Sequence, residues 1–228
     1  MSRAYAALRL AFIPVEHTLW RLAVSGASNI PKDGPVILAA NHLSAADHMF
    51  LPVVSPRPVY FMAKAEYFTA RGPVPRARAS FMRAVGQVPI DRRGGRAALA
   101  GLEQCRQVIE SGKVFGIFPE GTRSPDGRLY RGKTGVARLA LMTGAPVVPV
   151  GLLGTEKVLP IGTVVPRPGH RVVVRFGEPI SWPRVELAEQ DVRQVRAITD
   201  EIMARIGALS GQETVNGYAV GRARAVTP

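Results

Sequence analysis

The chain has 228 residues, of which 46% are hydrophobic and 21% charged, and these proportions exclude a disordered chain or a fibrous repeat while allowing one large domain or two small ones. An excess of 30 Lys and Arg over 17 Asp and Glu gives a formal net charge of +13, which predicts an anionic partner such as nucleic acid, an acidic lipid surface or a phosphorylated substrate. The single cysteine, Cys105, excludes an intramolecular disulfide and a cysteine-based zinc site, and it favours a reducing compartment.

Residues 4–24 have the pattern of an amphipathic helix that is broken or kinked at Pro14. Its apolar stripe contains Leu8, Ala11, Phe12, Val15, Leu19 and Leu22. Charged residues interrupt the segment, so no signal-peptide core is expected, and no run in the chain reaches the roughly 18 apolar residues of a spanning helix. We favour the interpretation in which the stripe packs on its own domain; in the alternative it lies in a membrane interface.

Short apolar runs typical of buried strands follow at 35–40, 59–63, 87–90, 114–118, 147–150 and 171–176. Helical patterns lie between or after them, at about 45–52, 74–84, 96–111, 133–143 and 186–208. This alternation predicts an α/β fold with a mixed, largely parallel sheet covered by helices on both faces. The chain then divides into an N-terminal helical segment (1–30), one domain (31–209) and a polar tail (210–228) that we predict to be disordered.

The first predicted strand runs into Asn-His-Leu-Ser-Ala-Ala-Asp at 41–47, at the sheet edge where α/β folds bind ligands. If Ser44 is the N-cap of the next helix, Asp47 can reach back to the His42 imidazole and leave its other ring nitrogen available as a base. The alternative is a purely structural capping box formed by Ser44 and Asp47. Because no Gly-x-Ser-x-Gly nucleophile elbow occurs, a catalytic pair here needs the substrate to supply the attacking hydroxyl.

Two further strands end in charged residues. Phe-Pro-Glu-Gly-Thr-Arg-Ser occupies 118–124, where Gly121 allows close backbone approach to a ligand and Arg123 can bind phosphate. Pro-Ile-Asp-Arg ends at Arg92, inside a segment (57–96) that carries nine basic and two acidic residues, a local net charge of +7. The structural alternatives are an ordinary turn with a Glu–Arg ion pair and a surface Asp–Arg pair.

Taken in order, these segments resemble the glycerolipid acyltransferases, specifically the 1-acyl-glycerol-3-phosphate acyltransferases. The resemblance covers about residues 35–155 and rests on ordered motifs at the family's spacing. These are the His-x4-Asp motif with its preceding asparagine (Asn41, His42, Ser44, Asp47), the Gly…Pro-Ile-x-Arg block (Gly86, Pro89, Ile90, Arg92), Phe-Pro-Glu-Gly-Thr-Arg-Ser (118–124), Lys-x-Gly (133–135) and Val-Val-Pro-Val (147–150). Leu43 stands where the family often has a polar residue.

The resemblance implies a glycerol-3-phosphate acyltransferase-like fold and an enzyme of phospholipid synthesis. His42 is then the general base, Asp47 orients it, and the 147–150 block supports the acyl pocket. The implied substrate-binding residues are Arg92, Glu120, Gly121, Thr122, Arg123 and Lys133. We expect a lysophospholipid acceptor, acyl-CoA or acyl carrier protein as the donor, no other cofactor and no metal. The protein is expected to bind peripherally to the cytoplasmic face of the cell membrane, where the anionic membrane surface attracts its positive charge.

Two alternatives to this function stay open at the level of sequence. The same chemistry could use another acceptor, such as glycerol 3-phosphate or a glycolipid. A different class is a basic nucleic-acid-binding protein, which predicts a recognised reader motif or aromatic residues interleaved with the positive charge. No reader motif appears, so we expect no nucleic-acid partner.

Overall fold

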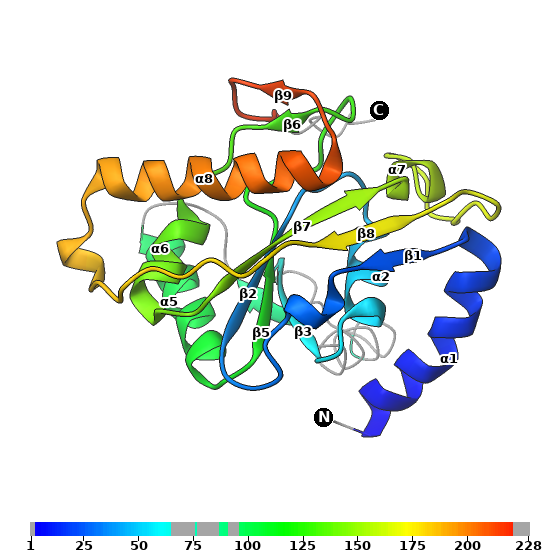
Figure 1. Cartoon of the computed structure of the whole chain (residues 1–228), viewed down its shortest axis with the longest axis horizontal. Coiled ribbons are helices and arrows are strands. Elements are labelled where there is room, and N and C mark those ends of the chain that lie inside the picture. The colour runs from blue at the N-terminus through cyan, green and yellow to red at the C-terminus, as the bar shows by residue number, and fades with distance from the viewer. Residues whose placement is uncertain (1–2, 65–75, 77–86, 91–95, 221–228) are drawn as a thin grey trace.

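The computed structural model describes residues 3–64, 76, 87–90 and 96–220, and it contains a seven-stranded sheet (Figure 1). The strand order is β1-β8-β7-β2-β5-β3-β4. The strands are β1 (Ala23–Ser25), β2 (Val36–Ala40), β3 (Val59–Lys64), β4 (Gln87–Ile90), β5 (Val114–Ile117), β7 (Val147–Leu153) and β8 (Val173–Phe176). Strands β7, β2, β5, β3 and β4 run parallel, whereas β8 is antiparallel to β7 and parallel to β1. The predicted mixed, largely parallel sheet is confirmed.

Strand β2 lies at the centre of the sheet, between β5 and β7. Its five residues are all apolar and all buried, as expected for a parallel strand covered on both faces. Successive side chains point to opposite faces, so Val36, Leu38 and Ala40 join one hydrophobic core while Ile37 and Ala39 join the other.

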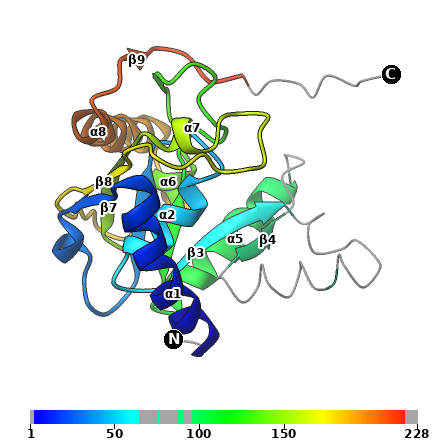
Figure 2. The same cartoon turned by 90° about the vertical axis from the view of Figure 1, so that its right-hand side faces the viewer.

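Helices cover both faces of the sheet. One core is completed by α1 (Arg3–Trp20), α2 (Asp47–Val54) and the short α7 (Thr155–Val158), which contribute Trp20, Phe50, Leu51 and Val158. The other core is completed by α5 (Arg96–Glu110), α6 (Gly135–Thr143) and α8 (Val192–Ser210), as Figure 2 shows from the side. The predicted covering of both faces is therefore confirmed, and the helix expected at 74–84 lies almost entirely outside the described residues.

Helix α1 differs from the interpretation that we favoured. The helix is continuous across Pro14, and three stripe residues, Phe12, Val15 and Leu19, are 40%, 42% and 40% exposed. Its buried face instead carries Glu16 and Trp20. The prediction that the stripe packs on the protein's own domain is therefore wrong for these three residues. The large indole of Trp20 fills the core on the buried face of the helix instead.

The C-terminal segment is ordered further than its composition predicts. β9 (Thr214–Val215) pairs in parallel with β6 (Leu129–Tyr130), and the Gln212 side chain donates to the Gly127 carbonyl oxygen at 2.6 Å. The prediction of disorder is therefore wrong for residues 211–220, and residues 221–228 lie outside the described chain. These contacts join segments about 85 residues apart, so local composition carries no signal for them. Likewise β1, inside the N-terminal segment that we set apart, joins the main sheet.

Candidate active site

The site forms where the loops after β2 and β5 meet. The two strands are neighbours and parallel, with Ala39 opposite Ile117, so the residues that follow them emerge at the same edge of the sheet. This pairing brings the 41–47 loop against the 118–124 loop, although about 75 residues separate them in the sequence.

His42 and Asp47 are in direct contact. The imidazole Nδ1 lies 2.8 Å from Asp47 Oδ2, and the same oxygen accepts hydrogen bonds from the backbone N–H groups of Leu43 and Ser44. A carboxylate only accepts, so this network assigns the proton to Nδ1 and the lone pair to Nε2. Asp47 is fully buried while His42 stays partly exposed, which leaves a base that a substrate can reach.

The local geometry differs from the expected cap. Asp47 is the first residue of α2 and Ala46 is its N-cap, so Ser44 lies before the helix and does not cap it as predicted. The Ser44 hydroxyl accepts from the Ala46 N–H and donates to the Leu159 carbonyl oxygen at 2.6 Å. Asp47 therefore reaches back to His42 as predicted, while the Ser44 hydroxyl binds the 41–47 loop to the chain after α7.

Aromatic rings hold the His42 imidazole in place. Phe118 stacks on it with ring centroids 4.0 Å apart and planes 16° from parallel, and Phe61 stacks on Phe118 at 5.7 Å. Phe61 fits because Gly116 has no side chain: a Cβ there would lie 2.3 Å from the Phe61 ring. No local pattern in the sequence points to Phe61 and Gly116, since only their cross-strand position connects them to the site.

Glu120 is buried and faces the backbone. Its two oxygens accept hydrogen bonds from the N–H of His42 at 2.9 Å and the N–H of Tyr130 at 3.1 Å. Burial raises the pKa of Glu120 to about 7, against the lowering effect of these two bonds, and the negative charge of Asp47 adds to the rise. Ser124 N–H donates to the His42 carbonyl oxygen at 2.7 Å, so the 118–124 loop binds both backbone polar groups of His42.

The Lys133 side chain packs against Gly121, two residues before Arg123. Gly121 has a φ of 75°, a conformation that favours glycine, and a Cβ there would lie 3.0–3.1 Å from the end of the Lys133 side chain. Within the described residues, neither Lys133 nor Arg123 forms an ion pair with a carboxylate, so the alternative of a Glu120–Arg123 pair is not found. Thr122 is partly buried in the same loop, and Arg92 lies outside the described residues.

Comparison with known proteins identifies the family. The family model described as Acyltransferase matches residues 21–153, more than half of the chain. This protein belongs to the acyltransferase family. Among its relatives are 1-acyl-sn-glycerol-3-phosphate acyltransferases from Brassica napus (BAT2, chloroplastic; 32% identical, covering 78% of this chain and 50% of the relative) and from Borreliella burgdorferi (32% identical, covering 65% and 60%).

The architecture is also found in a solved relative. The crystal structure of the 1-acyl-sn-glycerophosphate (LPA) acyltransferase PlsC from Thermotoga maritima superposes with a TM-score of 0.64 at 26% identity, covering 93% of this chain and 85% of that chain. This likeness confirms the acyltransferase fold. The chain spans about half the length of the plant relatives that it matches and 60% of the Borreliella protein.

Proposed function

We propose that this acyltransferase moves a fatty acyl group from an acyl thioester to the free hydroxyl of 1-acyl-glycerol-3-phosphate, which yields phosphatidic acid. The observation that carries the proposal is the His42–Asp47 pair, with a reachable base nitrogen, in the same site as the cations Arg123 and Lys133. The named activities of the relatives support the choice of acceptor.

In the proposed reaction His42 acts as a general base. Its Nε2 takes the proton of the acceptor hydroxyl while the hydroxyl oxygen forms a bond to the thioester carbonyl carbon. Asp47 accepts from Nδ1–H throughout and stabilises the imidazolium. The tetrahedral adduct then collapses, the carbon–sulfur bond breaks, and the departing thiolate takes the proton from Nε2. A base positioned in this way supplies about 10²–10⁴ in rate.

The acceptor's phosphate is proposed to bind to Arg123 and Lys133. A guanidinium binds phosphate through two parallel hydrogen bonds and an ammonium contributes a point charge, while Gly121 lets the Lys133 side chain pack close against the 118–124 loop. The resemblance adds Arg92 to this set. For Glu120 the contacts favour a supporting role, because its oxygens already accept from His42 and Tyr130.

We further propose that the protein works peripherally, on the cytoplasmic face of the cell membrane. The acceptor and product are membrane lipids, and the outward face of α1 presents Phe12, Val15 and Leu19. Among the helices of the described residues, none is both long enough and apolar enough to cross a bilayer.

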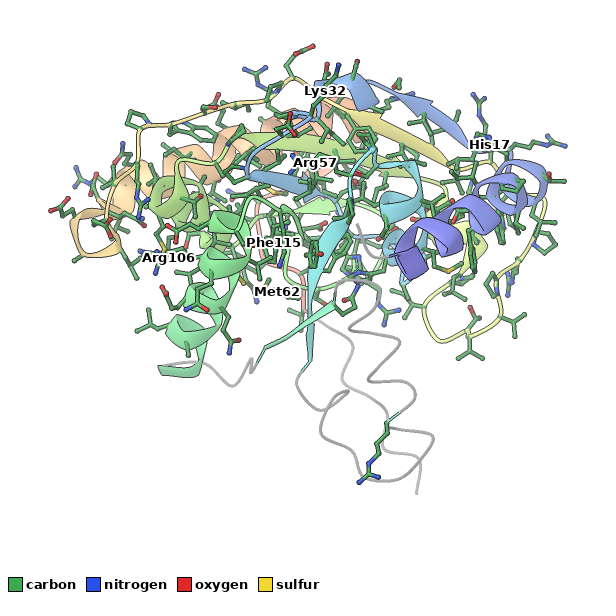
Figure 3. The ribbon with its side chains drawn as sticks, turned by 90° about the horizontal axis from the view of Figure 1, so that it is seen from below. His17, Lys32, Arg57, Met62, Arg106 and Phe115 are labelled. Carbon is green, nitrogen blue, oxygen red and sulfur yellow. The ribbon has the colours of Figure 1, made fainter. Side chains whose placement is uncertain are left out.

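Arg57, the first residue of the basic segment 57–96, binds backbone carbonyl groups of its own domain. Its guanidinium donates to the carbonyl oxygens of Pro31, Gly34 and Gly112 at 2.7–2.9 Å. Figure 3 shows it close to the turn that carries Lys32, which precedes β2 and so lies at the opposite edge of the sheet from His42. The membrane proposal therefore rests on α1 rather than on Arg57.

The test is an acceptor panel. Purified protein receives palmitoyl-CoA, oleoyl-CoA or an acylated acyl carrier protein with 1-acyl-glycerol-3-phosphate, glycerol 3-phosphate or a glycolipid, and mass spectrometry identifies the products. We expect phosphatidic acid from the first acceptor and little product from the others. Faster turnover of glycerol 3-phosphate or a glycolipid would overturn the acceptor, and tight nucleic-acid binding without turnover of any acceptor would overturn the function.

A further inference from the structure

The loop between α7 and β8 carries large apolar side chains into solvent. Val164 is 89% exposed and Val165 72% exposed, and Ile161 is also exposed. The loop is closed at its base by a hydrogen bond from the Arg167 N–H to the Val158 carbonyl oxygen at 2.7 Å. Adjacent exposed valines at a loop tip are costly to leave in water, and apolar residues gathered in this way mark an interaction surface.

The base of this loop is fastened to α1. The Trp20 indole donates to the Arg167 carbonyl oxygen at 2.7 Å, and the Gly169 N–H donates to the Leu19 carbonyl oxygen at 2.7 Å. Figures 1 and 2 both place the loop beside the C-terminal end of α1. The loop therefore lies on the same side of the molecule as α1, with its base held by these two hydrogen bonds.

The charge around the loop favours an anionic partner. Lys157, Arg167 and Arg171 are exposed, and none of them forms an ion pair within the described part of the chain. From 157 to 177 the sequence contains no acidic residue. This arrangement matches the surface of an anionic bilayer. The apolar tip would enter the acyl-chain layer, and the cations at the base would meet the phosphate layer above it.

The loop also begins next to the catalytic base. The Ser44 hydroxyl, two residues from His42, donates to the Leu159 carbonyl oxygen at 2.6 Å. A bilayer that contacts the loop therefore lies next to the residues that would receive a lipid acceptor.

We propose that the α7–β8 loop is a membrane-docking element, which inserts Val164 and Val165 into an anionic bilayer while Lys157, Arg167 and Arg171 contact lipid phosphates. The inference rests on the proposed function insofar as the acceptor resides in that bilayer. The α7–β8 loop would then be a second membrane contact beside α1, although the two segments lie far apart in the sequence.

The first test measures vesicle binding by co-sedimentation, independently of activity. With vesicles of equal parts phosphatidylcholine and phosphatidylglycerol, the double variant Val164→Ser/Val165→Ser should lose about tenfold or more in partition coefficient, because two apolar side chains no longer enter the bilayer. Val164→Trp should bind more tightly, since an indole favours the interface. The matched control is Val192→Ser, which alters a valine that is 69% exposed at the start of α8, on the opposite side of the molecule (Figure 1).

The second test separates the charges. Arg167→Gln/Arg171→Gln should weaken binding to the anionic vesicles but leave binding to pure phosphatidylcholine unchanged. Lys32→Gln/Arg193→Gln removes the same charge elsewhere and should weaken binding less. The proposal would be overturned if the valine double variant bound vesicles within twofold of the wild-type partition coefficient. It would also be overturned if the two double charge variants lowered binding to anionic vesicles equally.

A third test separates a failure of the docking proposal from a failure of the proposed enzymatic function. It measures activity on a water-soluble, short-chain acceptor without vesicles. The valine double variant should turn over that acceptor as wild type does. Loss of this vesicle-free turnover would assign the valines to substrate binding and overturn docking. If wild type itself shows no turnover while vesicle binding still depends on the valines, docking stands and the proposed function fails. As the folding control, the variant should unfold at the same temperature as the wild-type protein.

Discussion

A buried glutamate in α1 makes the folding stability of this protein depend on pH. Glu16 is fully buried, and neither of its carboxyl oxygens has a hydrogen-bond partner within the described residues. Burial raises its pKa from 4.5 to about 8. The folded protein therefore keeps a proton that the unfolded chain releases above pH 4.5. The substitution Glu16→Gln removes this ionisation while keeping nearly the same side-chain volume.

The two pKa values determine the size of the effect. Because the folded-state pKa of Glu16 is the higher one, stability is lost as the pH rises from about 4.5 to about 8, and the loss is complete above that window. A pKa difference of this size corresponds to about 5 kcal/mol at most, and to about 3 kcal/mol at pH 7. The uncharged amide that the substitution introduces carries a desolvation cost of about 1–3 kcal/mol, which does not change with pH.

The assay is urea unfolding of wild type and Glu16→Gln at pH 5, 7 and 9, followed by circular dichroism. The stability of the variant relative to wild type should rise by about 4 kcal/mol from pH 5 to pH 9. Glu120 titrates in both proteins, so its contribution cancels in this difference. Glu178→Gln, at an exposed glutamate, should show a constant difference. A constant difference for Glu16→Gln as well would show that Glu16 is already ionised in the folded protein and would refute the reasoning.

Three further predictions concern the site. His42→Ala should lower kcat by about 10²–10⁴ in a thiol-release assay, and Asp47→Asn should lower it less because the base remains; near-native turnover of His42→Ala would contradict the assigned role. Arg123→Ala should raise KM for the phosphorylated acceptor and not for acyl-CoA, and the reverse would place Arg123 on the donor side. Gly116→Ala should cost about 1–3 kcal/mol of unfolding free energy and reduce kcat, because the added methyl meets Phe61 at 2.3 Å; unchanged stability would show that the ring moves freely.

Matched variants control these experiments. Gly135→Ala adds a methyl to a helical glycine that has nothing within 4 Å of the new Cβ, so the stability loss of the strand variant should be absent. Arg193→Ala removes an exposed arginine on α8 and should leave both KM values unchanged.

The sequence by itself predicted six of the seven strands of the main sheet and the contact between His42 and Asp47. Five consecutive apolar residues predict β2, because that composition at that length is typical of a strand buried on both faces. The spacing of His42 and Asp47 places the second residue in the first turn of the following helix, where it can reach back to the imidazole. These features depend on residues close together in the chain, and local patterns describe such residues well.

Tertiary structure decided which residues support that chemistry and which apolar surfaces stay uncovered. Glu120 changes from an expected ligand of the acceptor to a buried holder of the His42 backbone, because β2 and β5 are neighbours in the sheet. Phe12, Val15 and Leu19 of the α1 stripe face outward because Trp20 fills the core, and Gln212 reaches Asn41 across 171 residues. Periodicity shows that a face is apolar, but whether another element covers it depends on the packing of distant segments, and this information is absent from the local pattern.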